Sequence, residues 1–264
     1  MKGWSLPFSP KGVASTLTPP PWHYSGDLLA IEFETTADTI ASMLPCDLEA
    51  TESTQCIAIF ADWSSAADSD PRLIEDPRRG MYKEAFIVVP ARYRGDTYGR
   101  VPYIWVDNEV AHARGHVQGF PKKLGEVFMS RPVAVGRGGP RREVGNTFVG
   151  TLSAMGRQLM RGRVDLSEET PISELPPMLL APQIHTRYLP SLDPESAPLH
   201  QHSINVLTDV AAGTALSGPA ELEFFDSEHE ELSDIGITKV GKGYFVSVAM
   251  TVTGAKTLPA ERIA

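Results

Sequence analysis

Short runs of hydrophobic residues, separated by Gly, Asp and Pro, recur along the chain. Val, Ile, Leu and aromatic residues dominate them, and most runs are strand-length rather than helix-length. We predict strands at Leu28–Glu34, Gln55–Ala61, Ala85–Tyr93, Val101–Val106, Glu126–Val135, Thr147–Leu152, Gln158–Val164, Ser203–Thr208, Ala220–Phe225 and Tyr244–Val252. Many short strands and few helices favour an α+β, mainly β fold, a barrel or sandwich, over a βαβ nucleotide fold.

Two short helices are predicted between these strands. Thr36–Leu44 has a threonine suited to an N-cap, apolar residues at helical spacing, and Pro45 at its end. A second helix is expected from a cap at Asp107 through Arg114, with Gly115 at its C-terminal end. The segment that follows this second helix carries the most distinctive chemistry of the chain.

Two stretches are predicted to lack long regular elements. Residues 1–26 are rich in Pro, Ser and Gly and are expected to form an extended N-terminal arm. Residues 166–200 contain seven prolines, which disfavour long helices and central strands, so we expect a long ordered connection there. Residues 27–264 are predicted to form a single domain.

Composition narrows the possible functions. With 42% hydrophobic and 22% charged residues among 264, the chain has the composition of a globular protein. The formal charge of −9 disfavours nucleic acid as a partner. No apolar run is long enough to span a bilayer, so we expect no membrane association and a cytoplasmic location. Cys46 and Cys56 lack a CxxC or His-rich companion motif and are predicted to be buried thiols that form no disulfide.

The segment Gly119-Phe120-Pro121-Lys122-Lys123-Leu124-Gly125 places two amines in an apolar, turn-forming setting. An amine must be neutral to attack a carbonyl, whereas an ordinary lysine is protonated at neutral pH. Burial penalises the charged form, and a nearby cation acts in the same direction. We expect desolvation to be the main cause here, because sequential side chains on a strand or helix diverge.

This segment resembles the active-site signature of the acetoacetate decarboxylase family. Further similarities lie in Asp107-Asn108-Glu109, Ala113-x-Gly115, Tyr82 and Glu84 before Val88-Val89-Pro90, Pro182 with Arg187 and Pro190, and Gly218-Pro219 with Leu222, Phe225 and Asp226. They extend from about Asp27 to about Val252. The resemblance implies a closed, cone-shaped β barrel with surrounding strands and short helices. It also implies a homo-oligomer, with a tetramer as one form, and the N-terminal arm at an interface.

The same resemblance implies a set of site residues. Lys122 matches the Schiff-base lysine, Lys123 the neighbour that influences its pKa, and Glu84 the active-site carboxylate, a general acid/base. Tyr82, Gln118 and Phe120 are expected to line the substrate site, with neutral hydrogen bonds from Tyr82 and Gln118. A covalent Schiff base needs neither a cofactor nor a metal, so none is predicted.

Two departures from the family pattern bear on the reaction. The family has an arginine just before the first long strand, where this chain has Ser25-Gly26-Asp27, and a second glutamate whose counterpart falls near Ala58. Carbonyl activation by Lys122 is retained, whereas the arrangement for losing carbon dioxide is altered. We therefore predict a Schiff-base lyase, an aldolase-dehydratase that condenses pyruvate with an aldehyde. Acetoacetate decarboxylation, giving acetone and carbon dioxide, is the alternative.

Two other function classes stay open. Glu109, His112 and His116 would share a helix face and could bind a metal, as could His200 and His202 on a strand. The chain contains no HExxH motif. A non-catalytic binding protein on the same fold is the remaining alternative.

Overall fold

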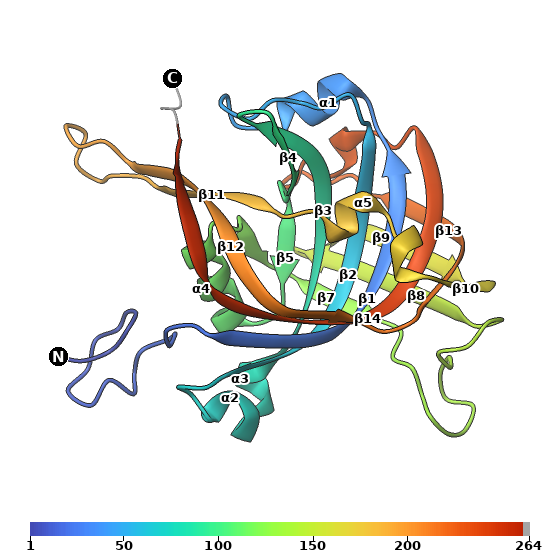
Figure 1. Cartoon of the computed structure of the whole chain (residues 1–264), viewed down its shortest axis with the longest axis horizontal. Helices are drawn as coiled ribbons and strands as arrows, with labels where there is room; N and C mark the ends of the chain where they lie inside the picture. Colours follow the sequence, from blue (N-terminus) through green and yellow to red (C-terminus); the bar gives the residue numbers. More distant parts are fainter. Residues whose placement is uncertain (261–264) are drawn as a thin grey trace.

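The computed structural model describes residues 1–260, in which a single curved sheet dominates (Figure 1). The sheet has fourteen strands. Their bounds are β1 Trp22–Glu34, β2 Gln55–Ala67, β3 Met81–Tyr93, β4 Asp96–Arg100, β5 Ile104–Val106, β6 Lys122–Leu124, β7 Glu126–Met129, β8 Thr147–Ala154, β9 Arg157–Asp165, β10 Glu168–Thr170, β11 Ile184–Leu189, β12 Leu199–Ala212, β13 Ala215–Phe224 and β14 Lys239–Pro259.

Short helices fill the connections. They are α1 Ala37–Ser42, α2 Arg72–Glu75, α3 Pro77–Gly80, α4 Glu109–Gln118 and α5 Pro177–Leu180, with 3-10 turns at Ile172–Glu174 and Ser233–Ile235. None of the helices in residues 1–260 has the length and apolar character needed to cross a bilayer. The prediction of a mainly β α+β fold is confirmed.

The sheet curls into the predicted cone shape. The strands follow the order β6-β5-β3-β2-β1-β14-β13-β9-β8-β7, and the two strands at the ends of this path, β6 and β7, are separated in sequence by Gly125 alone. No hydrogen-bonded ladder between β6 and β7 is found in residues 1–260, so the sheet has the predicted cone shape but is not closed by hydrogen bonds as the family resemblance implied. Paired strands are antiparallel except β5 and β6, which run parallel because α4 connects them.

Each face of the sheet carries its own apolar core. One face packs large side chains such as Phe60, Phe148 and Phe245 into the interior of the cone. The other face is covered by α4, α5 and the segment before β6. Strand β3 lies between both cores and is buried along most of its length, which explains its nearly continuous apolar sequence.

Several predicted boundaries were wrong for local reasons. Strand β1 begins at Trp22, inside the segment predicted as an arm, because it pairs with both β2 and β14 from that residue onward. Strand β7 ends at Met129 rather than Val135, since Pro132 lies just beyond and cannot donate to a ladder. The proline-rich 166–200 segment contains β11, whose ends lie between Pro182 and Pro190.

The two predicted helices exist with altered ends. Thr36 caps α1, as predicted, by accepting a hydrogen bond from the Thr39 amide. Helix α4 is capped by Asn108 instead of Asp107 and continues to Gln118, where Gly119 ends it with φ of 98°. A glycine adopts this left-handed conformation readily. Gly115 therefore lies inside the helix, and one further turn of α4 reaches the site described below.

Candidate functional site

Lys122 begins β6, directly after the turn that ends α4. Its side chain is buried, with 7% of its surface exposed, and points to the face covered by α4. The stem lies against Gly115, where an added Cβ would come within 2.4 Å of Lys122 Cδ. The glycine within Ala113-x-Gly115 thus provides the space for this lysine, and His116 Nε2 donates to the Lys122 carbonyl at 2.9 Å.

Glu84 of β3 meets the Lys122 amine inside the protein. Lys122 Nζ lies 2.6 Å from Glu84 Oε2, and both side chains are nearly inaccessible to solvent. The other carboxylate oxygen, Oε1, accepts a hydrogen bond from Trp63 Nε1 at 2.9 Å. Gly26 makes room for Trp63, because a Cβ at Gly26 would approach the indole ring to 2.5 Å. The carboxylate is therefore held by one cationic and one neutral donor.

The surroundings of Lys122 shift its amine toward the neutral form. Burial lowers the pKa of Lys122, the adjacent Glu84 carboxylate opposes that shift, and the Arg114 guanidinium adds to it. A lower pKa increases the fraction of neutral amine near pH 7. Desolvation is thus the main cause, as the sequence predicted, and the second cation comes from α4.

Lys123 lies on the opposite face of β6. Its amine pairs with Glu230, a buried carboxylate that also accepts from Trp105 Nε1 at 3.3 Å. The amine also sits 5.8 Å from the centre of the Trp105 ring. Adjacent residues on a strand point to opposite faces, so the two lysines of the motif occupy different surroundings.

Aromatic rings border the Lys122 amine. Its Nζ lies 5.4 Å from the centre of the Tyr82 ring and 5.6 Å from that of Phe120. Burial raises the pKa of Tyr82 well above its usual range, with the Glu84 charge acting in the same direction. Tyr82 therefore stays a phenol that can donate a hydrogen bond.

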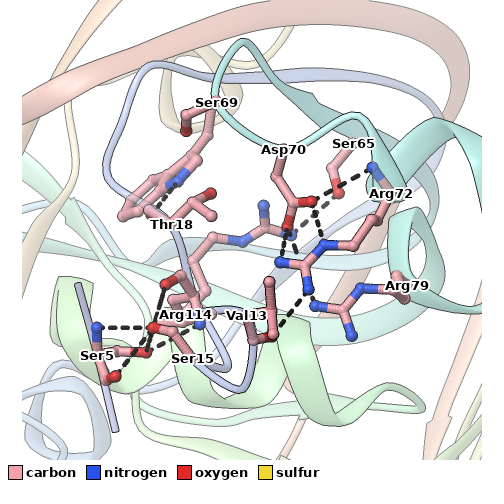
Figure 2. Close-up of polar contacts among 12 residues, drawn as sticks. Ser5, Val13, Ser15, Thr18, Ser65, Ser69, Asp70, Arg72, Arg79 and Arg114 are labelled. Carbon is pink, nitrogen blue, oxygen red and sulfur yellow. Dashed lines mark hydrogen bonds and ion pairs between the residues drawn. The ribbon is translucent and has the colours of Figure 1, made fainter. Parts of the chain in front are cut away.

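Arg114 and Gln118 extend the site along α4. Arg114 is 3% exposed and donates to Ser65 Oγ at 3.0 Å (Figure 2). Its guanidinium carbon lies 5.1 Å from the centre of the Tyr24 ring. Gln118 is also buried, and its side-chain amide interacts with the Tyr24 hydroxyl. Burial raises the pKa of Tyr24, and Arg114 and the Gln118 amide oppose that shift. Sequence reasoning missed Arg114. The signal was the four-residue spacing of Arg114 and Gln118, which one face of a longer helix would share.

Asp27 and Ala58, which stand at the two departures from the family pattern, both lie on the face of the sheet away from Glu84. Asp27 accepts a hydrogen bond from Ser247 and lies near neither Lys122 nor Glu84 in the contacts of residues 1–260. Ala58 is in the core on the face away from Glu84. The position directly opposite Glu84 on β2 is Ala61, so no second carboxylate stands across from Glu84 on that strand.

The predicted metal-ligand sets serve other contacts. His112 and His116 lie with ring centres 4.6 Å apart, and His202 pairs with Asp47 at 2.8 Å. Across residues 1–260, no group of three or more His, Cys, Asp or Glu side chains is arranged to hold a metal ion.

The chain is similar to one protein family and to several solved structures. The family model described as acetoacetate decarboxylase matches residues 5–261. The enduracididine biosynthesis enzyme MppR complexed with pyruvate is 32% identical, with a TM-score of 0.90 and 98% of each chain covered. Another structure shows MppR complexed with the condensation product of pyruvate and imidazole 4-carboxaldehyde, also at 32% identity and a TM-score of 0.90, covering 97% of this chain and 96% of that one.

More distant structures share the fold. An acetoacetate decarboxylase-like enzyme from Sphingomonas wittichii RW1 is 22% identical, with a TM-score of 0.89, and the alignment covers 98% of this chain and 100% of that one. Acetoacetate decarboxylase from Legionella pneumophila is 21% identical, with a TM-score of 0.78 and coverage of 98% and 96%. A search of curated protein sequences found no match.

Proposed function

The chain belongs to the acetoacetate decarboxylase family, and from that premise we propose that it is a Schiff-base lyase that condenses pyruvate with an aldehyde and dehydrates the product. The observation that carries the proposal is the buried Lys122 amine 2.6 Å from the Glu84 carboxylate. The similarity to MppR structures containing pyruvate and a pyruvate–aldehyde condensation product supports this choice of chemistry.

The first step joins the lysine to the keto acid. Neutral Lys122 attacks C2 of pyruvate, and the resulting carbinolamine loses water to give a protonated imine. Glu84 takes the proton that Lys122 loses on becoming neutral, and then donates a proton to the departing hydroxyl. Covalent attachment through an imine uses no metal or organic cofactor.

The second step makes and uses a carbon nucleophile. Glu84 removes a proton from the pyruvate methyl group, and the electron pair moves toward the imine nitrogen to give an enamine. The enamine carbon attacks the aldehyde carbon, and the new alkoxide takes a proton. Loss of that hydroxyl with a second C3 proton forms a carbon–carbon double bond. Hydrolysis of the imine then frees Lys122, so one pyruvate and one aldehyde give one unsaturated keto acid and one water.

Arg114 and Gln118 are placed to hold the pyruvate carboxylate. Arg114 makes one hydrogen bond to a side chain, Ser65, and the Gln118 amide is buried and interacts with Tyr24. A guanidinium and an amide N–H are donors that suit a carboxylate. Both residues lie on α4 within one turn of Gly115, and Gly115 packs against the Lys122 stem.

The experiment that tests this function is borohydride trapping with pyruvate and, in parallel, with acetoacetate. Wild-type protein should form a reduced pyruvate adduct that peptide mass mapping places on Lys122. Lys122→Met should form none. Lys123→Met is the matched control and should keep its adduct, because Lys123 faces away from the site.

Carbon dioxide release separates the two candidate reactions. The family's own name favours decarboxylation, and the same lysine could support it. Efficient release of carbon dioxide from acetoacetate, with no condensation product from pyruvate and aldehydes, would replace our proposal with that activity. The absence of any adduct from folded protein would remove the Schiff-base mechanism altogether.

A further inference from the structure

Arg114 carries a buried charge that no carboxylate of the described chain holds. Only 3% of its side chain is exposed, and none of the ion pairs found in residues 1–260 includes it. Arginine is almost never buried without a partner. The guanidinium is therefore available to an anionic substrate group, and other contacts must hold it in place.

The hydroxyl of Ser65 fixes one end of Arg114. This hydroxyl donates to the Gly80 carbonyl at 3.0 Å, so its lone pairs are left to accept from Arg114 Nη2, also at 3.0 Å. A single neutral hydrogen bond restrains only one nitrogen of the planar guanidinium. The orientation of the plane must be set by further contacts.

Two aromatic rings of β1 supply these contacts. The guanidinium carbon lies 5.1 Å from the centre of the Tyr24 ring and 5.8 Å from that of the Trp22 ring. Arginine is attracted to aromatic faces, and more strongly where water is excluded. Tyr24 also packs edge to face against Trp63, the indole that donates to Glu84, with ring centres 6.2 Å apart. The two rings therefore set the position of Arg114 relative to the Glu84 carboxylate.

The N-terminal arm, residues 1–21, holds the Trp22 ring. Trp22 Nε1 donates to the Thr18 carbonyl at 3.0 Å. Trp4 meets Trp22 edge to face, with ring centres 5.7 Å apart and planes inclined by 79°. Trp22 is 4% exposed whereas Trp4 is 43% exposed, so the Trp4 ring lies on the solvent side of Trp22.

The arm is itself fastened to the body of the protein. The Ser5 amide donates to Ser15 Oγ at 2.9 Å, which closes the arm into a loop (Figure 2). The Val13 carbonyl accepts from Arg72 Nη1 at 2.9 Å, and Arg72 pairs with the buried Asp70 at 2.6 Å. These contacts make the arm a fixed support for Trp22.

We propose that the N-terminal arm positions Arg114 for the carboxylate of the keto acid, and that it acts through Trp22. A guanidinium binds a carboxylate most strongly through two parallel N–H bonds, so the orientation of its plane matters. Trp22 is a positioning residue, because it acts on the substrate through Arg114. This inference rests on the proposed function, in which Arg114 holds the pyruvate carboxylate.

The test compares pyruvate with methyl pyruvate, which keeps the reacting carbonyl and methyl groups but carries no charge. The measurement is the second-order rate constant for borohydride trapping on Lys122. Trp22→Leu should lower that constant for pyruvate about tenfold, the scale of one desolvated cation–π contact. The constant for methyl pyruvate should fall by less than about twofold, as for sites that do not interact.

Three further variants make the result specific. Trp22→Phe keeps an aromatic face and should restore most of the loss for pyruvate. Trp4→Ala should lower the constant for pyruvate about threefold, within the range of one aromatic pair. Phe8→Ala is the matched control and should change neither constant, because Phe8 is a similarly exposed aromatic residue of the arm that belongs to no ring pair within residues 1–260.

The two ketones distinguish positioning from general stability. Equal losses for pyruvate and methyl pyruvate in Trp22→Leu would show a merely structural role and overturn the inference. No loss for either ketone would overturn it as well. If Trp22→Leu does not fold, Trp4→Ala decides, because Trp4 lies at the surface and outside the buried core.

Arg114→Met separates this inference from the proposed function. It should remove the preference for pyruvate over methyl pyruvate. A preference that is lost in Arg114→Met but kept in Trp22→Leu and Trp4→Ala refutes the role of the arm alone. A wild-type protein that forms no adduct with pyruvate refutes the Schiff-base function, and the inference about the arm falls with it.

Discussion

Gly115→Ala tests whether the position of the lysine stem controls activity. Gly115 lies inside α4, where alanine is the better helix former by about 1 kcal/mol. Its φ is not in the left-handed region, so the backbone accepts alanine without strain. Any functional loss must then come from the added methyl group, which would meet Lys122 Cδ at 2.4 Å and Cγ and Cε at 2.7 Å.

The size of the effect follows from these contacts. Ordinary van der Waals contact begins near 3.4 Å, so the Lys122 stem must move by about 1 Å. A similar shift at Nζ would lengthen the 2.6 Å contact with Glu84 beyond hydrogen-bonding distance. Misplacement by about 1 Å can cost about 100-fold in rate. The strain of overpacking, about 1–3 kcal/mol, is partly offset by the gain in helix propensity.

We therefore expect the Gly115→Ala variant to trap pyruvate, and to turn over, about 100-fold more slowly than wild type. Its free energy of unfolding in denaturant should stay within about 2 kcal/mol of the wild-type value. Gly254→Ala is the matched control, because a Cβ at Gly254 meets nothing within 4 Å. A Gly115→Ala enzyme with wild-type trapping kinetics would show that the stem's placement against α4 does not limit the reaction, and would refute the reasoning.

Other predictions follow from the same structure. Trp63→Phe removes the donor to Glu84 Oε1, and deuterium exchange of the pyruvate methyl group should slow about tenfold, as for one lost hydrogen bond to a charged group; an unchanged exchange rate would contradict that role. Arg114 lowers the pKa of Lys122, so Arg114→Met should move the rise of trapping rate with pH to higher pH; movement to lower pH would be the wrong sign. Gly150→Ala would place a methyl 2.4 Å from a buried phenyl ring and should cost about 1–3 kcal/mol in chemical denaturation. Light scattering after size exclusion should give a multiple of 28.7 kDa, and a monomer would refute the predicted homo-oligomer.

Sequence reasoning singled out residues from two separate segments that the structure brings together. Lys122 and Glu84 are 38 residues apart and meet as an ion pair in the structure. Tyr82 and Phe120, both predicted to line the site, border the same amine. The apolar neighbours of the lysine indicated burial, because a charged group is rarely placed among them without a partner.

The other features depend on strand pairing and on where a helix ends, which the sequence alone does not determine. Arg114 was missed because a glycine was taken as the end of α4, whereas Gly115 serves close packing and Gly119 ends the helix. Strand β11 was not predicted because it lies in a proline-rich segment and exists through its pairing with β12. Lys123 shows why adjacency is a poor guide to proximity, since one step along β6 reverses the face.

The pairing of β1 with β14 has a consequence for biosynthesis. Trp22 pairs with Val252, so β1 meets one of its two neighbours only after all the strands between β1 and β14 in sequence have been made. Until then β1 presents an open edge, and open apolar edges promote association between chains. Pairing across such a sequence distance is also slow, because a large loop must close first. We expect yield in a cell to depend on growth temperature and chaperone supply more strongly than the stability of the finished protein would suggest.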